Sequence, residues 1–322
     1  MNDIRWFAPN SYTALLLPEL RHRGLSIAQE GEDPARLALA MSGTRAEQAW
    51  RYARREGCPL VLYIWDLPPR ATSFGSYDPV WSLGRFLVRL PRLSGGFGRR
   101  RGYYSRLRYI AARAREVWVP SGMTCDLVRE RFGLESKRVP YCYDSERFYP
   151  APVARDDPPT LLTVSRFKAH KNQAATIQAA ACLGIPVQVR LIGWGPDAIP
   201  LGRLAHSLGV QCRIQSEASD ADVVDAYRRA AVAVCPSKFE GFGLTPIEAI
   251  AVGTSVVASD IPPHREFVGN SAVFFSPDDE DTLPKAVLTA LHQHGPNPEA
   301  VRTLSIQAAA ERFLRHVTPL LR

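Results

Sequence analysis

Short apolar runs alternate with helix-like segments along most of this chain, and no other sequence feature constrains the fold as strongly. In the second half the runs are TLLTVS (160–165), VQVRLIG (187–193), VAVCP (232–236), TSVVAS (254–259) and AVFFS (272–276). In the first half they are IRWFA (4–8), LVLYIW (60–65) and EVWVP (116–120), with helices expected at 45–56 and 123–132. Such alternation is typical of α/β units on a parallel sheet.

The length of the chain, 322 residues, suits two domains of about 150 residues each better than a single core. We expect the border in YDSERFYPAPVARDDPPT (143–160), which contains four prolines and no apolar periodicity. The sequence therefore predicts an N-terminal domain at 1–150, a more regular doubly wound domain at 151–300 and a C-terminal helix at 301–322.

The net charge of +8 is concentrated in one segment, 83–115, which holds ten arginines and no Asp or Glu. The other 289 residues carry 30 basic and 32 acidic groups. A single basic segment in an otherwise balanced chain indicates a local anionic partner rather than a generally basic surface.

Targeting features point to a cytoplasmic protein. The six cysteines, at positions 58, 125, 142, 182, 212 and 235, show no C-x-x-C spacing, which favours a reducing compartment. The first 20 residues lack the basic start and apolar run of a signal peptide, and no run of about 18 apolar residues predicts a membrane span.

The segment SKFEGFGLTPIEAIAVG (237–253) admits two interpretations. In the first, Thr245 is a helix N-cap, Pro246 takes the first helical position and Glu248 closes a capping box. In the second, the turn at Gly241 and Gly243 exposes backbone N–H groups to an anion at a helix N-terminus. The cap leaves Glu240, eight residues before Glu248, unexplained, whereas carboxylates on both sides of an anion site suit a sugar nucleotide.

A second candidate site element is VSRFKAHKN (164–172), which follows the first strand of the C-terminal domain and contains Arg166 and Lys171. Ligands of open α/β sheets bind in such loops, at the carboxyl ends of the strands. The chain has 35 arginines and only five lysines, and three of the five, Lys168, Lys171 and Lys238, lie in or beside these two segments. Compact point charges of this kind suit phosphate groups.

With both elements in place, the chain resembles the retaining glycosyltransferases of family 4, which have the GT-B fold. The resemblance rests on VSRFKAHKN, on the Glu-x7-Glu pair within FEGFGLTPIEAIAVGTSVVASD and on IPPHREFVGNSAVFFSPDD, and it extends from about 117 to 279. VPSGMTCDLV, VPYCYDSERFYP and LIGWGP are similar to the connecting segments of that family. The resemblance implies two Rossmann-like domains that face each other across a cleft, with the C-terminal helix packing back toward the N-terminal domain.

The resemblance also implies roles for individual residues. Arg166 and Lys171 would bind the donor diphosphate and neutralise the leaving group, while Glu240 would contact the donor sugar and Glu248 the ribose hydroxyls. The amides around Phe242, Gly243 and Leu244 would hold sugar and phosphate, with Thr245 nearby. The donor would be a GDP-sugar or UDP-sugar, with no cofactor and no metal, and the acceptor would attack from the face that the diphosphate leaves. Preorganised cations and amides suit the charge that builds on the departing phosphate.

The first half departs from the family pattern. The family commonly has a Gly-Gly loop after its first strand, whereas FAPNSYTALLL offers Asn10 and Ser11. The family's His-Asp pair corresponds to Trp65-Asp66, where Asp66 takes either the polar role or that of a turn cap before Leu-Pro-Pro. The N-terminal domain is also short. The pair Asp220 and Asp222 has the D-x-D form of metal-dependent glycosyltransferases, but helix capping explains it better.

The basic segment 83–115 has three interpretations: a solvated arginine face, a nucleic-acid patch, and a surface that docks on an anionic membrane. No nucleic-acid-binding fold accompanies it, so we expect no nucleic-acid partner. Arginine interleaved with Phe, Leu, Tyr and Ile suits a membrane surface, where each basic residue contributes about 1 kcal/mol. We expect peripheral association at the inner face of the membrane.

The leading functional prediction is therefore transfer of a hexose from a nucleoside-diphosphate sugar to an acceptor hydroxyl, with retention, in glycan, lipopolysaccharide or other polysaccharide synthesis. Two alternatives stay open. One is an epimerase or phosphorylase on the same architecture, and the other is a module that binds a sugar nucleotide or a glycan without turnover.

Overall fold

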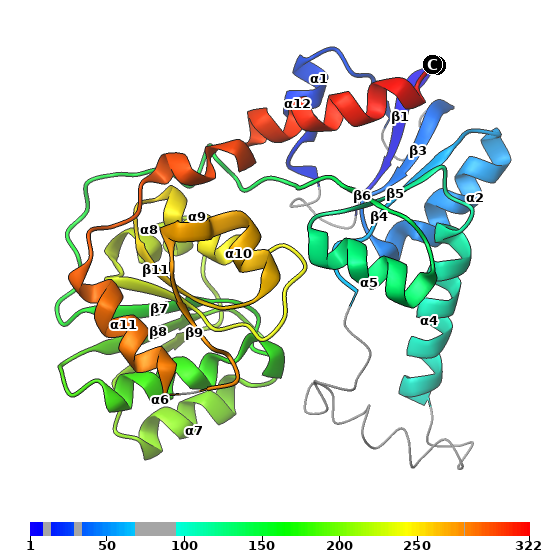
Figure 1. Cartoon of the computed structure of the whole chain (residues 1–322). Coiled ribbons are helices and arrows are strands. Elements are labelled where there is room, and N and C mark those ends of the chain that lie inside the picture. Colours follow the sequence, from blue (N-terminus) through cyan, green and yellow to red (C-terminus); the bar gives the residue numbers. More distant parts are fainter. Residues whose placement is uncertain (9–13, 29–33, 68–94, 280) are drawn as a thin grey trace. The chain divides into compact units, whose positions relative to one another are not determined.

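The computed structural model describes residues 1–8, 14–28, 34–67, 95–279 and 281–322, with the backbone alone for 95–101, and it divides into two compact units (Figure 1). Unit 1 comprises Met1–Cys142 and Ile306–Arg322, and unit 2 comprises Tyr143–Ser305. The segment that begins at Tyr143 belongs to unit 2 because the Tyr143 amide donates to the Leu304 carbonyl at 3.1 Å and the Phe148 ring lies 6.0 Å from that of Tyr227.

Unit 1 is built on a parallel six-stranded sheet in the order β2-β1-β3-β4-β5-β6. Its strands are β1 (Asn2–Phe7), β2 (Ile27–Ala28), β3 (Ala35–Ala40), β4 (Leu60–Tyr63), β5 (Glu116–Val119) and β6 (Lys137–Arg138). Its helices are α1 (Leu17–His22), α2 (Ala46–Glu56), α4 (Gly95–Ala111), α5 (Gly122–Phe132) and α12 (Ile306–Val317). The predicted strands at 4–8, 60–65 and 116–120 and the helices at 45–56 and 123–132 are confirmed.

Both faces of this sheet are covered, as neighbouring residues of β1 show. Trp6 contacts Phe313 of α12, with ring centroids 5.4 Å apart, and Trp118 of β5 contacts the same ring at 5.4 Å. Phe7 points to the opposite face and meets Tyr52 of α2 at 5.6 Å. The C-terminal helix is therefore part of the core of unit 1, which confirms that it packs back on the N-terminal domain.

One central strand, β3, has no counterpart among the runs predicted from the sequence. Its residues, ARLALA, are mainly good helix formers, so local propensity does not indicate a strand. Pairing with β1 on one side and β4 on the other makes it extended and buries Leu37 and Leu39 completely. Here the tertiary context overrides the propensity.

Unit 2 has a second parallel six-stranded sheet, in the order β12-β11-β10-β7-β8-β9. The strands are β7 (Thr160–Val164), β8 (Gln188–Ile192), β9 (Cys212–Gln215), β10 (Val232–Cys235), β11 (Ser255–Ser259) and β12 (Val273–Phe275). The helices are α6 (Gln173–Cys182), α7 (Ala198–Ser207), α8 (Asp220–Arg229), α9 (Leu244–Ala251), α10 (Pro262–Val268) and α11 (Thr282–His292). All five runs predicted for this half are strands, and β9 is the one that the sequence did not reveal.

The helices of unit 2 cover both faces of its sheet (Figure 1). On one face, α6, α7 and α11 bury a cluster of apolar side chains together with β7, β8, β10 and β11. On the other, α9 packs on β10, β11 and α10, while α8 packs on β7. In the described parts of both units, no helix has the length and apolar character that crossing a membrane requires. The predicted doubly wound α/β architecture is confirmed for each unit.

Candidate functional site

The candidate site of unit 2 lies where its chain changes direction across the sheet. β7 and β10 are neighbours, but β7 leads to β8 on one side and β10 leads to β11 on the other. The loops that follow β7 and β10 therefore lead to opposite sides of the sheet, and the carboxyl ends of two such strands are the usual ligand site of open α/β sheets. The two predicted site segments are these two loops.

The loop after β7 is held by a buried glutamine at the start of α6. Gln173 donates from Nε2 to the Arg166 carbonyl at 2.7 Å and to Ser165 Oγ at 2.8 Å. The Arg166 side chain is exposed, and its guanidinium lies 5.5 Å from the ring centre of Trp194. The backbone is thus fixed, while the guanidinium remains accessible to a ligand.

The two loops are joined by an ion pair. Lys171 Nζ lies 2.5 Å from Glu240 Oε1, and the two side chains are only 19% and 14% exposed. The Lys238 amide also donates to the His170 carbonyl at 2.8 Å. Burial opposes ionisation of Glu240, but its polar neighbours, Lys171 foremost, together outweigh burial and lower the pKa of this carboxyl. Burial also lowers the pKa of His170 to about 4, so its imidazole is neutral at pH 7.

The turn before α9 is built differently from the predicted cap, and its residues Gly241, Phe242 and Gly243 are buried. The N-cap is Gly243, with φ of +83°, and no side chain caps the helix. The predicted capping box of Thr245 and Glu248 is therefore wrong, because α9 begins one residue before Thr245. The Thr245 hydroxyl forms a hydrogen bond with the Cys235 thiol instead. A Cβ at position 243 would also lie 2.8 Å from Cδ2 of His264, so glycine is required here for conformation and for space.

Glu248 is buried on the inner side of α9. Its Oε2 lies 3.4 Å from the Tyr227 hydroxyl, which also lies 3.4 Å from the Thr245 carbonyl. Burial raises the pKa of Glu248 to about 8 even though the Tyr227 hydroxyl favours the ionised form. A carboxyl group kept neutral at pH 7 can both donate and accept a hydrogen bond, and this suits recognition of a hydroxyl pair.

His264 of α10 forms the wall behind Gly243 and was not predicted from the sequence. It is 1% exposed, and Nδ1 lies 3.0 Å from the Ser259 carbonyl. Burial lowers its pKa, so the neutral ring donates from Nδ1 to this carbonyl. A histidine in a helical PPHRE segment gives no sequence signal for such a role, because its contact with Gly243 arises only in the folded unit.

Trp194 is the second residue that the sequence did not reveal. It follows β8, is 62% exposed, and lies beside Arg166. A Cβ at the next glycine, Gly195, would lie 2.2 Å from the Phe167 carbonyl, so the two loops touch backbone to backbone. The GWG sequence was the available signal, since glycines on both sides of an exposed aromatic residue indicate close backbone approach.

Of the remaining predicted residues, two flank Gly243, one lies in unit 1 and two lie outside the described residues. Phe242 is buried, with its ring 4.5 Å from that of Phe267, and Leu244 is half-buried at the first position of α9. Asp66 is exposed beyond the carboxyl end of β4 in unit 1. Asn10 and Ser11 lie outside the described residues.

The D-x-D pair is a helix cap, as predicted, although through a neighbouring residue. Ser219 is the N-cap of α8 and accepts from the Asp222 amide, while the Asp222 carboxylate accepts from the Ser219 amide. Among the residues that the structure describes, no group of three or more His, Cys, Asp and Glu side chains is arranged to hold a metal ion.

The model of one protein family, described as glycosyl transferases group 1, matches residues 144–308, just over half of the chain. The chain belongs to this family. The matched region contains both loops of the candidate site, including the Lys171–Glu240 ion pair and the turn at Gly243.

Curated relatives of this group 1 chain include two bacterial mannosyltransferases. It is 26% identical over 184 residues to the O-antigen chain mannosyltransferase of Salmonella typhimurium, covering 56% of this chain and 52% of the relative. It is 27% identical over 197 residues to the phosphatidyl-myo-inositol mannosyltransferase of Mycolicibacterium smegmatis, covering 58% and 50%. The matches thus span about half the length of these relatives.

Solved structures show the fold of this group 1 chain as a whole. The sucrose-phosphate synthase of Thermosynechococcus elongatus superposes with a TM-score of 0.68 at 17% identity, covering 100% of this chain and 95% of the other. Together with the two parallel six-stranded sheets, this likeness confirms the predicted GT-B fold.

Proposed function

We propose that this chain is a glycosyltransferase that moves a hexose from a nucleoside-diphosphate sugar to an acceptor hydroxyl. The proposal rests on one observation: Lys171, Glu240 and the start of α9, which no side chain caps, lie together at the switch point of the unit 2 sheet. A sugar nucleotide has a matching sequence of groups, with hydroxyls on either side of a pyrophosphate.

The chain's residues would act mainly on the charge of the leaving group. Lys171, with two N–H donors left beside its bond to Glu240, and the exposed Arg166 would hold the diphosphate. The amides at the start of α9 would stabilise the charge that develops on the same phosphates. Glu240, kept ionised beside Lys171, would accept from hydroxyls of the donor sugar, and Glu248 would bind the ribose.

We further propose that the transferred sugar retains its anomeric configuration and that the reaction needs no metal ion. The unit 2 site offers cations and amides for the phosphate, so the departing phosphate oxygen can take the acceptor proton and no side chain has to act as nucleophile. GDP and UDP are both candidate carriers. Mannose is the first sugar to test, since both relatives described above are mannosyltransferases, and we propose a role in glycan or lipopolysaccharide synthesis.

Acceptor-dependent release of the nucleoside diphosphate tests the proposal. Calorimetry with GDP and UDP, followed by their sugars, identifies the carrier, and the release of diphosphate is then measured with and without a glycan acceptor. Release that requires the acceptor supports transfer. Equal release without it, or no heat with any nucleotide, contradicts the proposal and favours the alternatives.

We also propose peripheral association with an anionic membrane through 83–115. Of this segment, the side chains from Gly102 onward are described, and they include exposed Tyr103, Arg108 and Tyr109 on α4. Residues 83–94 lie outside the described residues. Flotation with vesicles that contain or lack anionic lipid tests this part, and equal recovery from both would contradict it.

A further inference from the structure

A cavity of about 410 Å³ lies in unit 1 at the amino ends of two central strands. It is formed where α2 ends, where β4 begins and where the chain passes from α4 into β5. The residues that line it are Trp50, Ala53, Arg54, Cys58, Pro59, Leu60, Arg113, Ala114 and Arg115. The candidate positions of the first half follow the carboxyl ends of the strands, so this cavity is at the opposite edge of the sheet.

Three arginines meet at this cavity without a carboxylate. Arg54, Arg113 and Arg115 line it, its lining includes no Asp or Glu, and none of the three pairs with a carboxylate of the described residues. The nearest carboxylates in sequence, Glu56 and Glu116, are paired with Arg55 and Lys137 respectively. The described residues of unit 1 therefore leave the positive charge at the cavity uncompensated.

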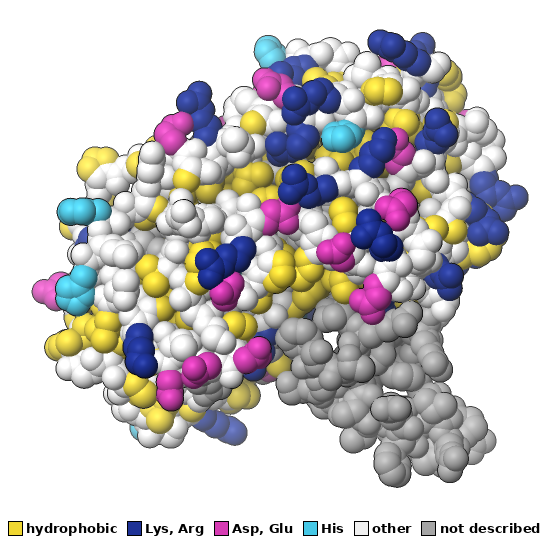
Figure 2. Space-filling view, in the orientation of Figure 1, with side chains coloured by type: hydrophobic (Ala, Val, Ile, Leu, Met, Phe, Trp, Pro, Cys, Tyr) yellow, Lys and Arg dark blue, Asp and Glu magenta, His cyan; other side chains and the backbone are white. Residues whose placement is uncertain are grey.

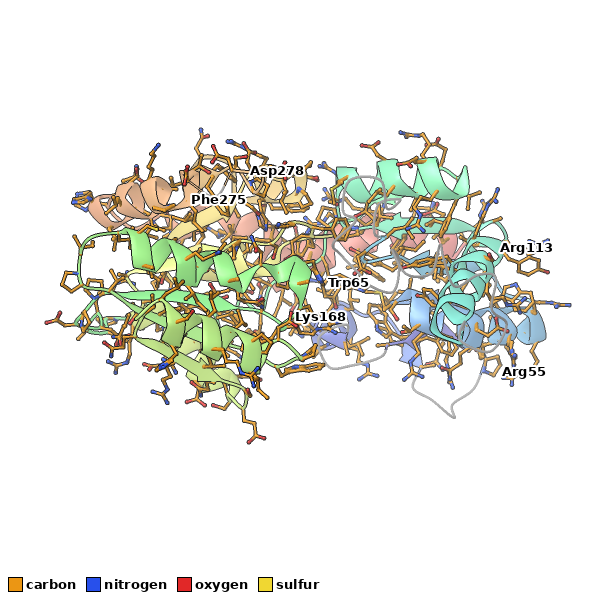
Figure 3. All side chains as sticks on the ribbon, turned by 90° about the horizontal axis from the view of Figure 1, so that it is seen from below. Arg55, Trp65, Arg113, Lys168, Phe275 and Asp278 are labelled. Atoms are coloured by element: carbon orange, nitrogen blue, oxygen red, sulfur yellow. The ribbon has the colours of Figure 1, made fainter. Side chains whose placement is uncertain are left out.

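The local structure explains how these cations are held. Arg54 lies in the last turn of α2 and Arg113 just after α4, where the negative ends of the helices favour cations. Arg113 donates to the Tyr109 carbonyl at 3.1 Å, and its guanidinium lies 3.7 Å from the Tyr109 ring centre. Figure 3 labels Arg113 at this end of unit 1, and Lys and Arg side chains gather over the same end in Figure 2.

Trp50 gives the cavity an aromatic wall. The Arg54 guanidinium lies 5.0 Å from the Trp50 ring centre, Arg106 lies 4.9 Å from it, and the Tyr109 ring packs edge-on at 5.8 Å. Arg106 is itself bound to Glu47 through two hydrogen bonds. The ring and its flanking cations are thus ordered before any ligand arrives, which lowers the entropic cost of binding.

We propose that this cavity binds a phosphate group, either of an anionic lipid headgroup or of a soluble phosphate compound. Guanidinium groups form paired hydrogen bonds with phosphate oxygens, and a phosphate offers enough acceptor oxygens for three arginines. The volume admits a phosphate with an attached organic group, which would pack against Trp50. This site is separate from the donor site of unit 2 and does not depend on glycosyl transfer.

Two tryptophan side chains allow the two anion sites to be measured separately. Indole N–H signals in an NMR spectrum are assigned with Trp50→Phe and Trp194→Phe variants, and inorganic pyrophosphate is then titrated. The Trp50 signal reports the cavity, whereas the Trp194 signal reports the donor site beside Arg166. We expect a saturable shift of the Trp50 signal. A Trp50 signal that stays in place while that of Trp194 moves would overturn the cavity and leave the donor site supported.

Variants of the arginines provide the control. Arg54→Gln and Arg115→Gln are each expected to weaken the pyrophosphate affinity seen at Trp50 by about tenfold, because each removes charge-assisted hydrogen bonds. Arg51→Gln is the matched control, since Arg51 lies on the same helix, is exposed and pairs with Glu47 outside the cavity. An equal loss in Arg51→Gln would show a general charge effect and contradict the site.

Vesicle flotation then distinguishes the two sources of phosphate. The wild type and the Arg54→Gln/Arg115→Gln double variant are floated with phosphatidylglycerol and with phosphatidylcholine vesicles. Preferential recovery of the wild type with phosphatidylglycerol, lost in the double variant, assigns the cavity to a lipid headgroup. Equal recovery of both proteins, with the Trp50 shift retained, assigns it to a soluble phosphate. If the wild type shows neither preferential recovery with phosphatidylglycerol nor a Trp50 shift with pyrophosphate, the proposal is overturned.

Discussion

Glu47 of unit 1 and Glu248 of unit 2 lie on helices that pack against a parallel six-stranded sheet, yet their pKa values shift in opposite directions. Hydrogen bonds from Arg106 and then Arg51 lower the pKa of Glu47 to about 2, whereas burial raises that of Glu248 to about 8. Glu47 compensates arginines at the surface, while Glu248 is buried beside a tyrosine hydroxyl.

The two units also differ in how far their charged side chains are exposed to solvent. In unit 2 the ion pair of the candidate site is shielded, because Lys171 and Glu240 are only 19% and 14% exposed. In unit 1 the cations of α2 and those described on α4 are exposed, and several stack on aromatic rings. Shielded charges interact strongly and tolerate little change, whereas exposed charges are screened by water and salt. Substitutions in unit 2 should therefore have the larger effects.

The largest effect is expected for Lys171→Ala, which removes a cation from the diphosphate site and leaves Glu240 without its partner. We expect the rate of transfer to fall about 10²- to 10³-fold, as for loss of one electrostatic contact to a leaving group. Lys168→Ala is the control, because Lys168 is exposed in the same loop. Steady-state kinetics on both variants provides the measurement. Equal transfer rates in the two variants would show that Lys171 does not act in the diphosphate site.

The next effect concerns Gly243, for which the chain offers a matched control. Gly243 and Gly253 both have φ of +83°, but a Cβ would lie 2.8 Å from the His264 ring in the first case and 4.0 Å from Pro298 in the second. Both alanine variants lose about 1 kcal/mol through backbone strain. Gly243→Ala should lose about 1–3 kcal/mol more through overpacking and should also lose nucleotide affinity. Denaturant unfolding measures the stability of both variants, and calorimetry measures their nucleotide affinity. Equal losses of stability in the two variants would show that the His264 side chain moves aside.

The pH dependence of stability tests the buried glutamate. A raised carboxyl pKa means that the folded chain keeps a proton which the unfolded chain releases above its ordinary pKa of 4.5. The stabilisation is complete below about pH 4.5 and is lost as the pH rises toward about 8, with a limiting slope of about 1.4 kcal/mol per pH unit. Glu248→Gln should lack this loss. Urea denaturation from pH 5 to pH 9 compares the two proteins, and parallel curves would contradict the assignment.

The smallest effect is expected at Glu47, which pairs with Arg106 at the surface of unit 1. The lowered pKa of Glu47 means that its contribution to stability is present above about pH 4.5 and is lost as the pH falls toward about 2. Glu47→Gln should remove this contribution and lower the free energy of unfolding by less than about 1 kcal/mol at neutral pH. Added salt should make the difference between the two proteins smaller. Thermal unfolding at low and high salt measures the difference. A loss as large as that of Gly243→Ala would break the contrast between the two units.

The sequence predicted unit 2 better than unit 1 for physical reasons. Its strands are rich in Val and Leu, and its candidate site residues occur in short segments whose chemistry is local, so Arg166, Lys171 and Glu240 could be proposed from the sequence. Contacts between distant segments carry no such signal, which is why the wall that His264 forms behind Gly243 was missed. The helix start was misplaced because a glycine with positive φ replaced the expected threonine cap. In unit 1, β3 was missed because leucine and alanine favour a helix until neighbouring strands pair with them.

The contact of Phe313 with Trp6 and Trp118 has a consequence for how the chain folds during synthesis on the ribosome. All of unit 2 emerges before the helix that carries Phe313, so unit 2 can finish folding while the tryptophans of unit 1 still lack their partner. A nascent chain stalled before this helix should therefore present exposed indole surface in the part that was translated first.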